Sequence, residues 1–72
     1  MRGNFIYKKI GRRISATRKK RGLTQEALSG ISCLHRTHIA RIENGSIKPS
    51  LHTLIILARK LDVKVCYLLE GI

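Results

Sequence analysis

Residues 23–45, LTQEALSGISCLHRTHIARIENG, contain two short helical patterns separated by very few residues. In the first pattern Thr24 is a suitable N-cap, and Ala27 and Leu28 form an inward-facing apolar pair. A helix is therefore expected from Thr24 to about residue 30 or 31. Residues 32–34 leave room only for a tight turn.

The second pattern predicts a helix over about residues 35–43. Ile39 and Ile42 are expected to face inward, and Asn44 followed by Gly45 is a typical helix end. No acidic residue occurs in this pattern before Glu43. Its first turns therefore present a basic and polar surface.

The remaining sequence predicts three further helices. One covers residues 5–20, which Gly22 ends, one begins after the N-cap Ser50, and a short last helix covers Val65 to Leu69. With no strand signal, the chain is expected to be all-α, a five-helix bundle in a single domain spanning residues 1–72. The apolar positions expected to be buried are Phe5, Ile6, Ile10, Ile14 and Thr17 in the first helix and Leu51, Leu54, Ile55, Leu57, Ala58 and Leu61 in the fourth.

The charge of the chain indicates a polyanionic partner. The 72 residues include 15 Lys and Arg against four Asp and Glu, which gives a net charge of +11. Nucleic acid is the first candidate and an anionic membrane the second, while a solvated basic face is the alternative that needs no partner.

Several functions are not expected. No apolar run is long enough to span a bilayer and no signal peptide is evident, so an intracellular, cytoplasmic protein is expected. Cys33 and Cys66 are expected to be free thiols there. The sequence offers no paired carboxylates, activated nucleophile or phosphate-binding glycine loop, so neither an enzyme nor a bound cofactor is expected.

Two helices joined by a turn of three or four residues form a helix-turn-helix, and residues 24–44 approximately fit this pattern. In a helix-turn-helix the second helix enters the DNA major groove. The sequence also resembles the lambda-type phage repressor and Cro family, whose members are also called xenobiotic-response-element-like regulators. The resemblance rests on IGRRI, LTQEAL, HIARIENG, KPSLHTL and ARKLDV, and covers roughly residues 10–70. HRTHI also resembles the recognition-helix start of restriction-modification controller proteins.

The resemblance implies a set of DNA contacts. Arg36 and Thr37 would be the main base readers, and Arg41 would contact a base or a phosphate. Apart from the resemblance, His38 is expected to face the DNA and to contact a base or a phosphate. The resemblance also implies an ion pair between Arg18 and Glu43 that joins the first helix to the end of the recognition helix. The residues expected to contact phosphates are Gln25, with Thr24 at the same helix start, and Asn44, Ser46 and Lys48 in the following loop.

The sequence departs from the family pattern at the turn. Cys33 stands where the family usually has glycine, so a left-handed backbone there would cost about 1–2 kcal/mol. His35 replaces the usual Ser or Thr cap, and a less sharply defined helix start is expected. The spacing of Cys33, His35 and His38 is not a strong zinc pattern, and surface histidines with no bound metal are expected.

The last helix is more apolar than is common in this family. Clustered exposed apolar residues indicate a contact surface, and a homodimer on a pseudo-palindromic site is expected from them. The alternative is that Tyr67 covers the domain's own core. The candidate interface residues are Val65, Cys66, Tyr67, Leu69 and Ile72.

The resulting hypothesis is a sequence-specific double-stranded-DNA-binding transcriptional regulator, a repressor or an activator that acts by promoter occupancy. RNA polymerase is a candidate contact of such a regulator. One alternative is an antitoxin-type protein that binds a partner toxin as well as DNA. Another is non-specific nucleic-acid binding through charge alone.

Overall fold

The computed structural model describes residues 3–70, which form five helices and, within that range, no strand. The prediction of an all-α fold is confirmed. The helices are α1 (Gly3–Lys20), α2 (Gln25–Ser32), α3 (Arg36–Glu43), α4 (Leu51–Lys60) and α5 (Val65–Leu68).

The caps of α2 and α4 agree with the sequence prediction. The Thr24 hydroxyl oxygen accepts a hydrogen bond from the Ala27 amide at 2.9 Å, and the Ser50 hydroxyl oxygen accepts one from the Thr53 amide at 3.1 Å. Each satisfies an amide that the first helical turn leaves unpaired. These side chains fix where both helices begin.

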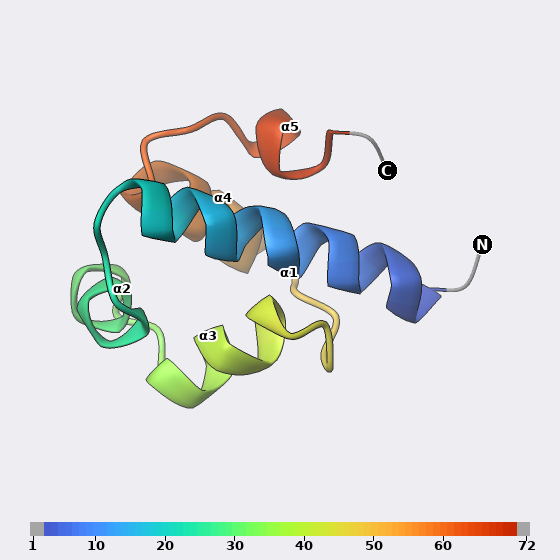
Figure 1. Cartoon of the computed structure of the whole chain (residues 1–72), viewed down its shortest axis with the longest axis horizontal. Helices are drawn as coiled ribbons and strands as arrows, with labels where there is room; N and C mark the ends of the chain where they lie inside the picture. The colour runs from blue at the N-terminus through green and yellow to red at the C-terminus, as the bar shows by residue number, and fades with distance from the viewer. Residues whose placement is uncertain (1–2, 71–72) are drawn as a thin grey trace.

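Helix α1 lies between α3 and α5, with α4 behind it and α2 beyond its C-terminal end (Figure 1). Ile14, Leu28, Ile39, Leu57 and Leu61 are fully buried at the centre of this arrangement. One apolar core therefore joins α1 to the two helices of the helix-turn-helix.

Three residues predicted to be buried are exposed. Phe5 is 47% exposed because the N-terminal end of α1 projects past the other helices (Figure 1), and it lies beneath the Lys9 ammonium group. Leu51 is 65% exposed in the first turn of α4. Ala27 is exposed because α2 buries the face of Leu28 and Ser32, one position away.

Helix α1 packs tightly against the end of α3 at Gly11. A Cβ atom at this position would collide with the carbonyl oxygens of Ile42 and Glu43. Glycine is therefore required for the distance between these two helices, and this distance sets how far α3 projects from the bundle.

The short helix α5 packs partly on the core of its own chain. Val65 and Leu69 are half-buried against the core, whereas Cys66 and Tyr67 are exposed, and Ile72 lies outside the described residues. The Tyr67 ring stacks with the Arg13 guanidinium at 5.1 Å. Of the five candidate interface residues, Cys66 and Tyr67 are the ones that the described structure leaves exposed.

No helix within residues 3–70 is long and apolar enough to cross a membrane.

Candidate nucleic-acid interface

The turn between α2 and α3 adopts the left-handed conformation that its position requires. Cys33 has φ 61° and ψ 19°, and its amide donates to the Ser29 carbonyl at 3.0 Å. The turn therefore keeps the usual geometry although it contains no glycine, and the backbone strain falls on Cys33.

The start of α3 is capped by backbone geometry alone. His35 occupies the N-cap position with extended dihedral angles, and its side chain makes no capping hydrogen bond. The first amides of α3 are therefore free of side-chain partners at the end where Arg36 and Thr37 lie.

Helix α3 has one buried face and one exposed face. Ile39 and Ile42 are buried, while Arg36, Thr37 and Arg41 are exposed. Thr37 and Arg41 are four residues apart and share a face, and Arg36 is in the same first turn. His38 is half-buried at the edge of this surface.

The only acidic residue of α3 faces away from the exposed surface. Glu43 accepts hydrogen bonds from Arg18 Nε at 2.7 Å and from Arg18 Nη2 at 3.0 Å. The two side chains are 9% and 6% exposed, and Arg18 Nη1 also donates to the Leu23 carbonyl at 2.7 Å. The planar guanidinium thus ties α1 to the end of α3 and to the start of the helix-turn-helix.

Burial raises the pKa of the Glu43 carboxyl group, but the hydrogen bonds from Arg18 and Gln25, together with the Arg18 charge, lower it further than burial raises it. The net pKa is below the ordinary value of 4.5. Glu43 is therefore ionised at neutral pH, and its charge is compensated inside the protein rather than displayed to a polyanion.

Gln25 takes part in the same network, a contact that sequence reasoning missed. Its Nε2 donates to Glu43 Oε1 at 3.1 Å. The two residues are 18 positions apart, so no helical spacing signals the contact. The network holds the first residue of α2 in a fixed orientation next to Thr24.

The loop after α3 is closed by its own polar groups. The Asn44 side-chain oxygen accepts from the Ser46 amide at 3.0 Å and also lies within hydrogen-bonding distance of the Ser46 hydroxyl. Gly45 has φ +78°, and a Cβ atom there would collide with Lys8 of α1. The loop that carries exposed Lys48 is therefore packed on α1.

The cysteine and histidine residues near the turn do not form a metal site in the described structure. Within residues 3–70, no three His, Cys, Asp or Glu side chains are grouped so that they could hold a metal ion. Cys33 and Cys66 are both exposed free thiols.

The geometry defines a helix-turn-helix protein, and comparison with known proteins agrees. Residues 14–68 match the helix-turn-helix family, and the chain belongs to it. This result confirms the resemblance to lambda-type repressors and Cro proteins.

Similar proteins include both phage repressors and controllers. The chain is 43% identical over 56 residues to an immunity repressor protein of Bacillus phage phi105, covering 78% of this chain and 39% of that protein. It is 40% identical over 60 residues to the control protein C.SmaI of Serratia marcescens, covering 83% of this chain and 71% of that protein. The chain spans less than half the length of two curated relatives that it matches.

A solved structure has the same arrangement of helices. The restriction-modification controller protein C.AhdI from Aeromonas hydrophila superposes with a TM-score of 0.83 at 34% sequence identity. The match covers 86% of this chain and 94% of that chain.

Proposed function

We propose that the protein is a sequence-specific double-stranded-DNA-binding transcriptional regulator without catalytic activity, acting as one helix-turn-helix domain. The observation that carries this proposal is the surface of α3. Arg36, Thr37 and Arg41 are exposed on a short helix whose opposite face is buried and whose only acid, Glu43, is paired with Arg18. The proposal is also supported by membership of the helix-turn-helix family.

Base reading is assigned to the exposed surface of α3. An arginine at the Arg36 position can form a bidentate contact with guanine O6 and N7, and Thr37 can donate to a base edge or contact a thymine methyl group. Arg41 and His38 extend the same surface, and each would contact a base or a phosphate. Each good bidentate contact discriminates between bases by about 1–3 kcal/mol.

Phosphate binding is assigned to both ends of the helix-turn-helix. The Thr24 hydroxyl accepts from the Ala27 amide and still has its own hydrogen to donate. The side-chain amide of Gln25 donates one Nε2 hydrogen to Glu43 and has a second one available for a phosphate. The helix dipole of α2 favours an anion at this end of the helix. Beyond α3, the loop of Asn44 and Ser46 and the Lys48 ammonium group would contact phosphates at the other end of the helix-turn-helix.

We further propose that the protein binds as a homodimer through the exposed side of α5, with Cys66 and Tyr67 at the contact. A two-fold assembly would place the two recognition helices about 34–36 Å apart on a pseudo-palindromic operator. The substitution Tyr67→Asp is expected to lower the assembly state in sedimentation experiments. Sedimentation of the unmutated chain as a monomer at high concentration would remove this part of the proposal.

Among regulators of this family, the controller type is favoured by the match to C.SmaI and by the superposition on C.AhdI. Such a regulator would act in the cytoplasm by occupying a promoter, either blocking RNA polymerase or contacting it.

A binding selection from random DNA duplexes at near-physiological salt tests the proposal. Non-specific charge binding weakens steeply as salt rises, whereas specific binding survives. Enrichment of a two-fold-symmetric sequence is expected. Absence of any enriched sequence from the folded protein would contradict the proposal.

A further inference from the structure

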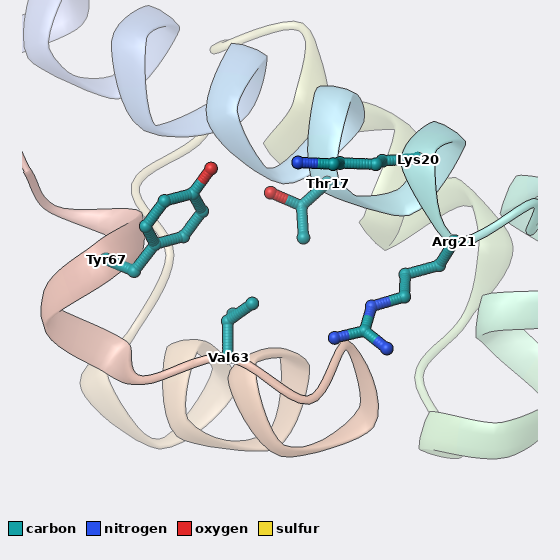
Figure 2. A pocket seen from close by; sticks show the side chains of 5 residues that line it. All are labelled: Thr17, Lys20, Arg21, Val63 and Tyr67. Atoms are coloured by element: carbon teal, nitrogen blue, oxygen red, sulfur yellow. The ribbon is translucent and has the colours of Figure 1, made fainter.

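A groove lies on the side of the molecule away from α3. It is lined by Thr17, Lys20 and Arg21 of the end of α1 and by Val63 and Tyr67, and its volume is about 400 Å³. Figure 2 shows Tyr67 and Arg21 at opposite ends of the groove, with the Lys20 side chain extending over Thr17. Figure 1 places α5 and α3 on opposite sides of α1, so this groove is separate from the exposed surface of α3.

A second hollow adjoins the first, because both share Val63. It has a volume of about 460 Å³ and is lined also by Ala58, Arg59, Asp62 and Lys64. We call these two hollows, which meet at Val63, the α1–α5 groove. A length of chain that crosses Val63 would contact both hollows, whereas one small molecule is usually enclosed on most sides by a single pocket.

The charge of the α1–α5 groove is strongly positive. Four cationic side chains line it, and Asp62 is the only carboxylate among its lining residues. Arg21 lies 3.6 Å from the Asp62 carboxylate, and both side chains are well exposed, so this ion pair neutralises little. The cations that line the groove without such a pair in the described structure are Lys20, Arg59 and Lys64.

The groove also has apolar surface held in a fixed position. Val63 is half-buried at the junction of the two hollows, and the Tyr67 ring is stacked on Arg13. Arg13 in turn donates to the backbone carbonyls of Tyr67 at 2.9 Å and of Glu70 at 3.2 Å. This wall is therefore organised before any partner binds, which lowers the entropic cost of binding.

We propose that the α1–α5 groove binds an acidic peptide segment of a partner protein, with carboxylates against Lys20, Arg59 and Lys64 and an apolar side chain on Val63, which leaves the exposed side of Tyr67 to the proposed homodimer contact. A second copy of this chain would match the positive groove less well than an acidic peptide, because the chain has only four acidic residues and a net charge of +11. The site is separate from the surface of α3, so the protein would hold DNA and the partner at the same time.

The test uses the full chain and a fluorescein-labelled dodecapeptide with four glutamates and two leucines. A second peptide with glutamine in place of each glutamate is the control for charge. Anisotropy titrations at near-physiological salt are expected to show tighter binding of the acidic peptide. If the two peptides bind equally, the proposal is wrong.

Two variants separate the groove from net charge. Lys20→Glu is expected to weaken binding of the acidic peptide about fivefold or more, because the reversed charge opposes a carboxylate at close range. Lys19→Glu makes the same change at the neighbouring exposed position, which lines neither hollow, and is expected to weaken binding less than about twofold. Equal losses would mean attraction by net charge alone and would overturn the proposal.

The location of binding is read from amide chemical shifts on addition of the acidic peptide. Changes at Lys20, Val63 and Lys64 are expected, and changes confined to Arg36 and Thr37 would show that the peptide occupies the α3 surface instead.

Lys20→Glu and Lys19→Glu are expected to bind DNA equally well, so failure of peptide binding is distinguishable from failure of DNA binding. A change in sedimentation caused by Lys20→Glu without peptide would identify the groove as a contact between copies and would overturn the proposal.

Discussion

The guanidinium of Arg18 in α1 and the carboxylate of Glu43 at the end of α3 are joined by two hydrogen bonds, of 2.7 and 3.0 Å, in a nearly solvent-free position. Arg18 also holds the Leu23 carbonyl, and Glu43 also holds Gln25. This network connects the scaffold helix to both helices of the helix-turn-helix. It accounts for an acidic residue so close to a surface proposed to bind a polyanion.

Removing Arg18 is expected to destabilise the protein strongly. In Arg18→Met the Glu43 carboxylate would remain buried without its cation, at a cost of about 3–5 kcal/mol. Urea unfolding monitored by circular dichroism measures the change. In the double variant with Glu43→Leu, part of the stability is expected to return, and a double variant less stable than Arg18→Met would contradict the role of the pair.

Stability is expected to fall in acid because of Glu43. Its pKa in the folded protein lies below the ordinary value of 4.5, so its ionisation stabilises the fold above about pH 4.5 and this contribution is lost as the pH drops through the folded-state pKa. Urea midpoints measured from pH 7 to pH 3 should therefore decline below about pH 5. Glu43→Gln should show a flatter profile, whereas an equally steep profile would assign the acid sensitivity to other carboxyl groups.

The contact of Gly11 with the end of α3 predicts a position that does not tolerate even one methyl group. Gly11→Ala is expected to lower the free energy of unfolding by about 1–3 kcal/mol, because α1 and α3 must separate to make room for the Cβ atom. Thermal melts measure this effect. Gly30→Ala in α2 is the matched control: nothing lies near its Cβ position, and alanine should be neutral or stabilising there.

The strained turn predicts a stabilising substitution. Cys33→Gly should raise the free energy of unfolding by about 0.5–1 kcal/mol, because glycine adopts φ 61° without strain but is more flexible when unfolded. Cys33→Ala retains the Cβ atom and is expected to give no such gain in a denaturation experiment. If both variants gain equally, loss of the thiol rather than relief of strain is the cause.

The sequence predicts the helices of the helix-turn-helix closely because the residues that set each helix boundary act on their own neighbours in the chain. Thr24, Ser50 and Gly22 act through amides or dihedral angles within their own turn, and such signals are readable from spacing. The sequence predicts less well which apolar residues near helix ends are buried. Phe5 and Leu51 continue the apolar pattern of their helices beyond the part that other helices cover.

Contacts between distant parts of the chain lie beyond periodicity. The hydrogen bond from Gln25 to Glu43 and the contact of Gly11 with the carbonyls of α3 depend on how helices cross. The Arg18–Glu43 pair was expected only from the family resemblance, since the two residues are 25 positions apart. The α1–α5 groove likewise joins residues from the two ends of the chain and has no local signature.

The most direct test of the account compares Arg36→Ala with the unmutated chain on the selected operator and on a scrambled duplex of equal length. Loss of a bidentate base contact is expected to weaken operator binding by about 1–3 kcal/mol, roughly 5- to 150-fold, and to weaken scrambled-duplex binding only slightly. Lys19→Ala removes the same charge from an exposed position on α1 and controls for electrostatics. Equal losses on both duplexes for Arg36→Ala would mean that this side chain does not read bases, and would contradict sequence recognition by α3.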